Sequence, residues 1–470
     1  MNQTLRTFSV ISITTVIAIK LFAFGLSYPM TLRVAGDAHQ YLSVANQFDS
    51  FASVWNYAGI RSVGLPFLEF TIKQALLAFT SADTFSAWVD TICAALLVTH
   101  VATVWFFSVW ARKTHLIGSV GGSLSLFAFL GTYPAFIGHT TLPLTDTLAV
   151  DLALCGGMAL EAAFGQKKLL RASILAGLCA LSFAGLILVR PGSIVGVAAA
   201  LAVAAAMSLY GNRRKTALIG IAALGCFAMM APFVSNCAQK YGGLCVQSMV
   251  PEFPQDAQAG LMGARTLWAR GYTNTGVIRT LPDETMVANF SSRCQLTSLL
   301  GLDESSLTGC LLARPFAIPA YVGKKWIGLF DHFRFTPFLE TQTPYWLRWL
   351  SRAYDSLSWV GLSLFFLSVI TVAREEARAR LKSLLADSIT PALLTVYSLT
   401  MLAQHTIMHI EERYGLPLIP LCATVLVMYG ERAIHKFPAF QRRTDGMLLL
   451  YCCLAWATFI GQISIWDNMV

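Results

Sequence analysis

The sequence predicts an all-α membrane protein that crosses the bilayer about eleven times. Of its 470 residues, 56% are hydrophobic and 13% are charged, whereas an ordinary soluble domain carries roughly 25% charged residues. Apolar windows of about 20 residues recur along the chain, and an α-helix needs this length to span the hydrocarbon core. The predicted spans lie near residues 8–28, 87–110, 116–137, 143–163, 173–190, 193–210, 216–235, 354–373, 389–409, 415–430 and 446–466.

Basic residues in alternate connections predict how these spans are oriented. Lys and Arg in short loops are retained on the cytoplasmic side during insertion, so we expect the N-terminus, with Arg6, on that side. The first apolar stretch contains Lys20 and lacks a small-residue cleavage pattern, which predicts an uncleaved signal anchor. The basic connections are Arg112-Lys113, Lys167-Lys168 with Arg171, Arg213-Arg214-Lys215, Arg374 to Lys382, and Arg432 to Arg443.

The apolar segment 66–80 differs from the predicted spans because it carries Glu69, Lys73 and Gln74. Charged side chains are costly at the centre of a bilayer. We therefore expect this segment to form a helix that lies in the membrane interface.

Two long segments, 29–86 and 236–353, fall on the non-cytoplasmic side of this arrangement. They predict three parts: an N-terminal membrane module over residues 1–235, a large outer loop, and a C-terminal membrane module over residues 354–470. The first module would hold seven spans and the second four. We expect the function to reside in the outer segments.

The large outer loop contains Cys237, Cys245, Cys294 and Cys310. An even number of cysteines in one non-cytoplasmic loop predicts two disulfides formed in an oxidising compartment, and three pairings are open. Pairing Cys237 with Cys245 and Cys294 with Cys310 is the arrangement with the shortest loops.

The net charge of +9 reflects the cytoplasmic loops and an excess of basic residues in the large outer loop. The second group favours an anionic lipid headgroup or a phosphate as the partner on the outer face. Because the loops account for the net positive charge, we do not expect a nucleic acid as partner.

A polar cluster directly after the first span, Gly36-Asp37-Ala38-His39-Gln40-Tyr41, contains the first catalytic candidate. The residues that follow are compatible with a helix, so Asp37 is predicted as its N-cap and Tyr41 as its neighbour one turn later. A helix cap is also the purely structural interpretation of Asp37.

Further polar groups stand at the predicted outer ends of other spans, and each also has a structural interpretation. Asp146 could complement a helix dipole, Arg190 could snorkel from a helix end, and Glu412 could pair locally with Arg413. Arg61 lies in the first outer segment.

Taken together, these motifs resemble the GT-C superfamily of membrane glycosyltransferases, which includes protein O-mannosyltransferases and the aminoarabinose transferase of lipid A. The resemblance implies a GT-C type fold and a transferase that moves one sugar from a polyprenyl-phosphate donor to a protein, lipid or glycan outside the cytoplasm. The matching segments are Gly36 to Ala45, Arg61 to Leu68, Leu142 to Leu148, Val189-Arg190-Pro191 and His409 to Pro420.

The chemistry of such a transfer accounts for the same residues. A base must deprotonate the acceptor hydroxyl, and cations must hold the phosphate that is left behind. Asp37 is the predicted base and Asp146 its assistant, and a Mg²⁺ or Mn²⁺ ion between these two carboxylates is left open. The predicted phosphate and substrate ligands are Arg61, Arg190, Arg413, Tyr41 and Glu412.

Two other classes of function fit a chain of many spans with outer arginines. A transporter or flippase of lipid-linked sugars would bind phosphate with the same arginines, and an O-antigen polymerase or ligase would also pair many spans with one large outer loop. Sparse charges at mid-membrane and the absence of a visible inverted repeat disfavour transport. The expected location is a bacterial inner membrane with the site facing the periplasm.

Overall fold

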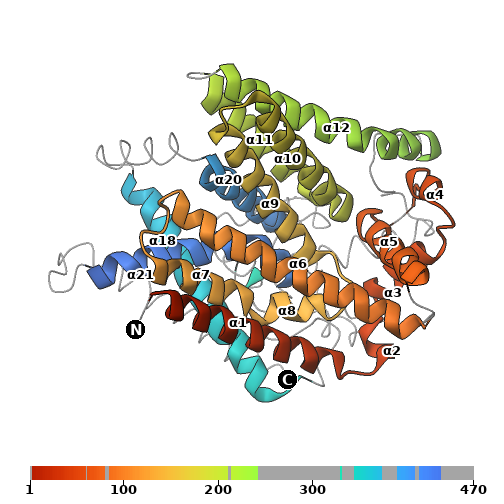
Figure 1. The fold of residues 1–470 in the computed structure, drawn as a ribbon, viewed down its shortest axis with the longest axis horizontal. Coiled ribbons are helices and arrows are strands. Elements are labelled where there is room, and N and C mark those ends of the chain that lie inside the picture. The colour runs from red at the N-terminus through yellow and green to blue at the C-terminus, as the bar shows by residue number, and fades with distance from the viewer. Residues whose placement is uncertain are drawn as a thin grey trace, which may run out of the picture.

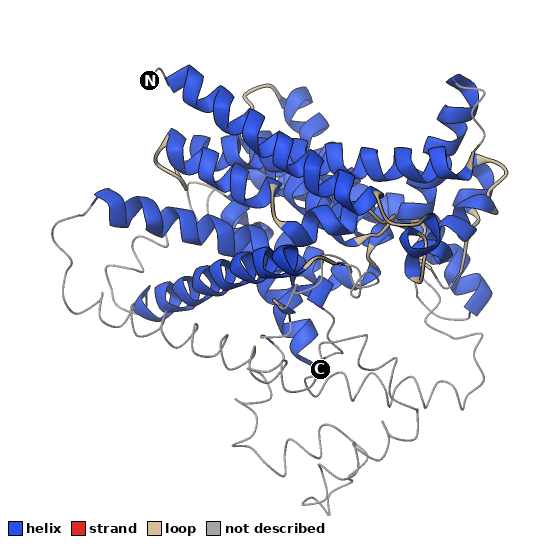
Figure 2. Ribbon diagram, turned by 90° about the horizontal axis from the view of Figure 1, so that it is seen from below, coloured by secondary structure: helices blue, strands red, loops and turns tan. Residues whose placement is uncertain are grey.

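The computed structural model describes residues 3–59, 61–79, 84–209, 213–241, 326, 329–330, 343–372, 389–407 and 412–435. Within these ranges the chain forms helices joined by loops, and no strand is present (Figure 1, Figure 2). The helices up to the large loop are α1 (Gln3–Leu26), α2 (Met30–Arg33), α3 (Asp37–Asn46), α4 (Phe51–Trp55), α5 (Gly64–Phe79), α6 (Phe85–Lys113), α7 (Val120–Gly131), α8 (Pro134–Thr140), α9 (Asp146–Gly165), α10 (Leu169–Val189), η1 (Pro191–Ser193), α11 (Ile194–Leu209) and α12 (Arg213–Tyr241). The later helices are α18 (Tyr345–Val372), α20 (Ile389–Ile407), η5 (Glu412–Leu418) and α21 (Ile419–His435).

Seven helical segments of the described ranges are long and apolar enough to cross a membrane. An eighth crossing results if the bent pair α7 and α8 counts as one span. The chain is therefore an integral membrane protein built from helices, as its composition predicts. The seven segments are Arg6–Leu26, Phe85–Lys113, Asp146–Gly165, Leu169–Val189, Pro191–Ser208, Arg213–Lys240 and Arg413–Arg432.

Four of the eleven predicted spans are not among these seven segments: 116–137, 354–373, 389–409 and 446–466. Helix α18 follows the predicted span 354–373 as far as residue 372, and α20 follows the predicted span 389–409 as far as residue 407, but neither is among the seven apolar segments. The N-terminal part of α18 carries the buried, charged side chains of Arg352 and Asp355. The last predicted span, 446–466, lies outside the described residues.

The predicted span 116–137 is a broken helix rather than a straight one. Helices α7 and α8 meet at an angle of 48°. Pro134 opens α8, and its missing N–H interrupts the hydrogen-bond ladder at the break. The two residues at the break instead anchor α18, because Thr132 shares a 2.7 Å hydrogen bond with Tyr354 and the Tyr133 hydroxyl donates to Asp355 at 2.7 Å.

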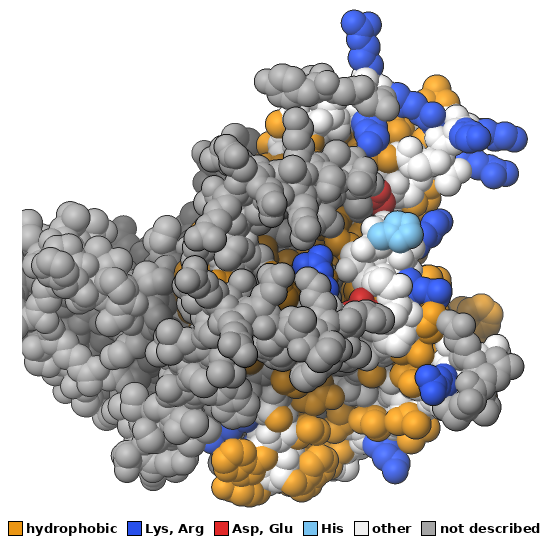
Figure 3. Space-filling view, turned by 90° about the vertical axis from the view of Figure 1, so that its left-hand side faces the viewer, with side chains coloured by type: hydrophobic (Ala, Val, Ile, Leu, Met, Phe, Trp, Pro, Cys, Tyr) orange, Lys and Arg blue, Asp and Glu red, His pale blue; other side chains and the backbone are white. Residues whose placement is uncertain are grey.

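Basic side chains mark the ends of several helices. Arg112 and Lys113 lie in the last turn of α6, and Lys168 precedes α10. Arg214, at the start of α12, donates to the carbonyl of Gln166, which follows α9. Several Lys and Arg side chains are visible among hydrophobic side chains on the face that lies at the left of Figure 1 (Figure 3). Which side of the membrane these helix ends face stays a prediction from the basic connections.

Helices from both predicted membrane modules share hydrophobic cores. Tyr397 and Met401 of α20 pack into the cluster that contains residues of α1, α6 and α10. Leu416 and Leu418 of η5 are fully buried in a second cluster, which includes Phe127 of α7. This packing brings the C-terminal segment that carries Arg413 against the N-terminal helices.

Helix α5 lies beside α3 and α4 at one end of the bundle, to the right in Figure 1. Its bounds match the predicted interfacial helix 66–80, but Glu69 has a side chain that is fully buried (0% exposed) instead of facing water. Neither carboxylate oxygen of Glu69 has a hydrogen-bond partner among the described residues. Burial raises the pKa of Glu69 well above its ordinary value, because the charged carboxylate is removed from water.

Candidate functional site

Five of the predicted site residues meet in one group at the end of the bundle opposite the basic connections. Arg61 donates to Asp37 at 2.7 Å, and Arg413 pairs with the other oxygen of Asp37 at 2.8 Å. Arg190 donates to Asp146 at 2.6 Å. Arg413 also lies 3.9 Å from Asp146, so it connects the two aspartates. We call these residues, Asp37, Arg61, Asp146, Arg190 and Arg413, the charged cluster.

Asp37 owes its position to the glycine that precedes it. Gly36 has φ 62° and is the N-cap of α3, which places Asp37 at the first helical position. The prediction that Asp37 itself caps the helix is therefore wrong, because the chain enters α3 through a left-handed residue. Gln40, one turn later, accepts a 2.5 Å hydrogen bond from Nε of Arg61, and Tyr41 lies beneath the Arg61 guanidinium at 5.6 Å.

The segment that carries Arg61 is fastened to the end of α10. The Ser62 hydroxyl donates to the carbonyl of Val189 at 2.9 Å. A Cβ added to Gly64 would lie 2.6 Å from the Val189 nitrogen, so only glycine permits this close approach. Because Val189 directly precedes Arg190, these contacts fix Arg61 and Arg190 relative to each other.

Asp146 and Arg190 occupy helix ends whose partial charges suit them. Asp146 is the first residue of α9, where the positive end of the helix dipole favours a carboxylate. Arg190 follows the last residue of α10, where the negative end favours a cation. Only 3% of the Asp146 side chain and 10% of the Arg190 side chain are exposed. This ion pair therefore lies at the floor of the charged cluster.

Arg413 reaches the cluster from η5, a 3-10 helix that contains Pro417. The ring of Tyr414 lies 4.7 Å from the Arg190 guanidinium and 5.6 Å from that of Arg413. The ring of His405, in α20, stacks on the Tyr414 ring with 4.6 Å between the ring centres. Tyr414 thus supports both arginines through their flat faces. The side chain of Glu412, also a predicted site residue, lies outside the described residues.

The electrostatics of the cluster favour an anion. Burial alone would raise the pKa of Asp37, but the charges of Arg413 and Arg61 outweigh it and lower the pKa below its ordinary value. Burial raises the pKa of Tyr41, with the Asp37 charge adding to the effect. Three arginines against two aspartates leave an excess of positive charge. One terminal nitrogen of Arg190 has no hydrogen-bond partner among the described residues.

A divalent cation does not fit this arrangement. Arg413 lies between Asp37 and Asp146, the two carboxylates between which the sequence left a metal ion open. Elsewhere in the described part of the chain, no group of three His, Cys, Asp or Glu side chains is placed to hold a metal. The two carboxylates instead pair with arginines and hold their guanidinium groups in place.

Several side chains in and near the site were not predicted from the sequence. His139 lies 3.9 Å from Asp146, and Gln40 holds Arg61. In the membrane-spanning part, His100 of α6 is buried against Asp151 of α9 at 2.9 Å. Asp151 could have been selected from the sequence, because an ionisable residue inside an apolar window is a functional candidate by default. His139 and Gln40 had none, since their roles depend on tertiary contacts.

The disulfide prediction falls largely outside the described residues. Cys237, at the C-terminal part of α12, is disulfide-bonded. Cys245, Cys294 and Cys310 lie outside the described residues, so the pairing stays a prediction. The remaining cysteines of the described ranges are free thiols: Cys93, Cys155, Cys179, Cys226 and Cys422.

Comparison with known proteins adds no assignment. No protein family matches the chain, and a search of curated proteins finds no match either. The functional interpretation therefore depends on the geometry of the site.

We expect Gly415→Ala to destabilise the protein by displacing η5, the helix that carries Arg413. A Cβ at Gly415, two residues after Arg413, would overlap the backbone carbonyl of Leu329. Relieving that overlap requires η5 to move, and overpacking of this kind costs about 1–3 kcal/mol. Thermal unfolding of the detergent-solubilised protein should show the loss of stability.

Gly430→Ala in α21 is the matched control, because a Cβ there meets nothing within 4 Å. This control should be neutral or slightly stabilising, since Ala favours a helix interior over Gly. Equal unfolding temperatures for the Gly415→Ala variant and the unsubstituted protein would refute the close approach of η5 to Leu329.

Proposed function

We propose that the chain is a membrane glycosyltransferase of the GT-C type, which moves a sugar from a polyprenyl-phosphate donor to an acceptor outside the cytoplasm. The observation that carries the proposal is the charged cluster. Its five members come from separate segments, and all meet at the predicted outer ends of spans. Residues that serve only as unrelated helix caps or snorkelling charges have no reason to converge.

The composition of the cluster suits phosphate on a lipid carrier. A guanidinium binds two phosphate oxygens at once, and the three arginines present donors from different directions. A polyprenyl phosphate carries its headgroup at the membrane boundary and its tail among apolar helices. The cluster lies at the ends of such helices, next to α9 and α10.

Asp37 is the proposed general base. In the transfer, the acceptor oxygen forms a bond to the anomeric carbon, the bond from that carbon to the phosphate oxygen breaks, and the hydroxyl proton passes to Asp37. The phosphate leaves with the bonding electron pair, and Arg190 and Arg413 stabilise its charge. Asp146, which is more deeply buried than Asp37, acts by positioning Arg190.

Arg413 links phosphate binding to the strength of the base. It pairs with Asp37 at 2.8 Å, and together with Arg61 it lowers the pKa of that carboxyl, which weakens it as a base. A phosphate that draws Arg413 away removes this effect, so the pKa of Asp37 rises when the donor is in place. Asp37 would then accept a proton most readily in the donor complex.

The wider architecture belongs to the same proposal. We place eleven spans in the full chain, with the N-terminus in the cytoplasm and the charged cluster facing the periplasm of a bacterium. The acceptor is a protein, lipid or glycan on that side, and the large outer loop is the segment that would select it. The structure of a helical membrane protein with outer polar segments is compatible with this arrangement.

The buried pair of His100 and Asp151 is the one observation that favours transport instead. Both side chains lie within spans and are almost fully buried, and ionisable pairs in such places often carry protons or substrates. The pair also has a structural role, because the second nitrogen of His100 lies 3.2 Å from the carbonyl of Leu130 and so joins α6, α9 and α7. We rank transport second on this ground.

One experiment separates the two functions. The purified protein in liposomes is given a panel of polyprenyl-phosphate sugars together with membrane extract as the source of acceptors. Release of free polyprenyl phosphate is the result that a transferase predicts. Movement of intact donor across the bilayer without its cleavage would contradict the transferase and favour the transporter.

Arg61→Gln should shift the pH dependence of turnover. Turnover requires ionised Asp37, so it falls as the pH drops through the pKa of that carboxyl. Arg61 helps to hold this pKa below its ordinary value against the opposing effect of burial. Loss of Arg61 therefore raises the pKa and moves the acid limb of kcat/KM to higher pH. The measurement is kcat/KM between about pH 3 and pH 8, a range that spans ordinary carboxyl pKa values.

Arg33→Gln is the control for this shift, because Arg33 pairs with Asp90 outside the charged cluster. Its acid limb should match that of the unsubstituted protein. Coincident acid limbs for all three proteins would remove Asp37 as the titrating base.

A further inference from the structure

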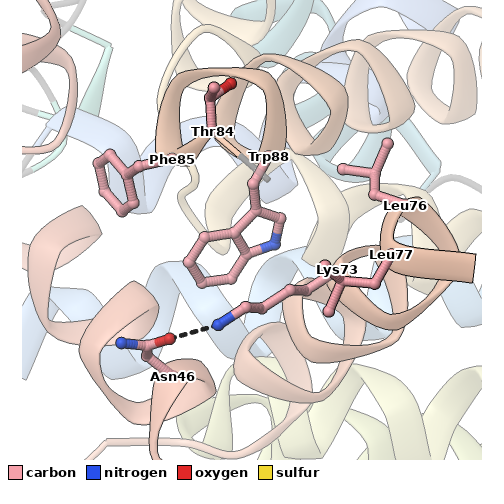
Figure 4. A pocket seen from close by; sticks show the side chains of 7 residues that line it. All are labelled: Asn46, Lys73, Leu76, Leu77, Thr84, Phe85 and Trp88. Atoms are coloured by element: carbon pink, nitrogen blue, oxygen red, sulfur yellow. Dashed lines mark hydrogen bonds between the residues drawn. The ribbon is translucent and has the colours of Figure 1, made fainter. Parts of the chain in front are cut away.

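A second recognition site lies at the other end of α3. Helix α3 has ten residues and is therefore about 15 Å long, with Asp37 at its start and Asn46 at its end. Next to Asn46 is a cavity of about 250 Å³ between α5 and the beginning of α6 (Figure 4). The residues that line it are Asn46, Lys73, Leu76, Leu77, Thr84, Phe85 and Trp88. This group does not overlap the charged cluster.

The cavity combines one cation with apolar walls. The ammonium of Lys73 extends along the Trp88 ring, 5.2 Å from its centre, and donates to the amide oxygen of Asn46 at 2.5 Å (Figure 4). Leu77 and Phe85 stand at the opening with 47% and 49% of their surface exposed. Large apolar side chains are exposed in this way where a protein meets lipid.

The positive charge of Lys73 is not cancelled from its own helix. Glu69, one turn earlier on α5, is the only acidic residue of that helix, and it is fully buried and does not line the cavity. Trp88, which forms the wall beside Lys73, donates its indole N–H to the backbone carbonyl of Glu69 at 2.8 Å, so the wall is fixed in place. The first turn of α6 forms the adjoining wall, and the positive end of that long helix adds to the field of Lys73.

We propose that this cavity binds an anionic phospholipid of the surrounding bilayer, with the lipid phosphate on Lys73 and the upper part of an acyl chain against Leu76, Leu77 and Phe85. Position favours this occupant, because the cavity opens where span α6 begins. Chemistry favours it too, since a cation beside an apolar wall matches a phosphate joined to a hydrocarbon chain. The inference does not rest on the proposed transferase activity.

The test measures which lipid the protein retains. Full-length protein is placed in nanodiscs made of equal parts phosphatidylcholine and phosphatidylglycerol, released into detergent, and analysed by native mass spectrometry. We expect the unsubstituted protein to retain phosphatidylglycerol preferentially, and Lys73→Gln to lower this preference about fivefold, the factor expected for one lysine near a membrane surface. Lys73→Arg, which keeps the charge, should preserve it.

Lys240→Gln is the matched control, because Lys240 lies at the end of α12 and donates to the backbone carbonyl of Ala58 at 2.8 Å without lining the cavity. It should retain phosphatidylglycerol normally. Unchanged preference in Lys73→Gln would overturn the proposal. Complete displacement of the lipid by inorganic phosphate would also overturn it, because the site would then recognise the free anion. Donor turnover is not part of this measurement, so the result is independent of the transferase.

Discussion

Replacing Asp37 by Asn is expected to lower turnover by about 10²- to 10⁴-fold, the range that a general acid or base contributes. The amide retains the shape of the carboxylate but cannot take the proton of the acceptor hydroxyl. It also leaves Arg61 and Arg413 without the carboxylate that they share, so donor binding should be preserved or tightened. The measurement is the rate of polyprenyl phosphate release at saturating donor.

Asp90→Asn provides the matched control for this result. Asp90 pairs with Arg33 at 2.8 Å near the beginning of span α6, so it is an arginine-bound aspartate outside the charged cluster. Its substitution should leave the rate within about twofold, as expected for a partly exposed ion pair. Near-normal turnover by Asp37→Asn would exclude Asp37 as the base.

Replacing Arg413 by Lys is expected to remove most of the activity although it keeps the positive charge. Nη1 of Arg413 lies 2.8 Å from Asp37 and 3.9 Å from Asp146. A planar guanidinium can present two parallel N–H donors to a phosphate, which an ammonium cannot. A lysine ammonium is a single point of charge on a flexible stem. Loss of one charge-assisted hydrogen bond costs about 1.5–3 kcal/mol, which is roughly a ten- to hundredfold loss of rate at the transition state.

Arg33→Lys tests whether any such substitution in this region is harmful. Arg33 is buried and pairs with Asp90 at the same 2.8 Å distance, but it lies outside the charged cluster. We expect the Arg33→Lys protein to transfer sugar at a rate close to normal. If Arg413→Lys were equally active, a bidentate contact by Arg413 would play no part in the reaction.

Much of the helical architecture could be predicted from the sequence. Apolar length placed α1, α6, α9, α10, α11, α12 and α21 within a few residues of the predicted spans, because a membrane demands long apolar helices. The break between α7 and α8 could have been anticipated from Pro134, which cannot continue a helical hydrogen-bond ladder. The pairing of Tyr133 with Asp355 at that break could not, because the two residues are far apart in sequence.

In the candidate site, too, the sequence identifies residues but does not predict the contacts between them. Asp37, Asp146, Arg190 and Arg413 were selected because each stands at the predicted outer end of a span. The contacts among them depend on tertiary packing, such as the approach of Gly64 to Val189, for which local sequence carries no signal. The burial of Glu69 was missed for a related reason, since a carboxyl on an interfacial helix is expected to face water unless packing encloses it.

Donor affinity of the Arg190→Ala and Arg413→Ala proteins tests the central claim most directly. Binding of a polyprenyl-phosphate sugar to each protein in nanodiscs is measured by titration, with Arg33→Ala as the control. If the charged cluster holds the donor phosphate, both variants should bind about ten- to hundredfold more weakly, while the control binds normally. Unchanged donor affinity and unchanged turnover in both variants would contradict the account and leave these arginines with a structural role.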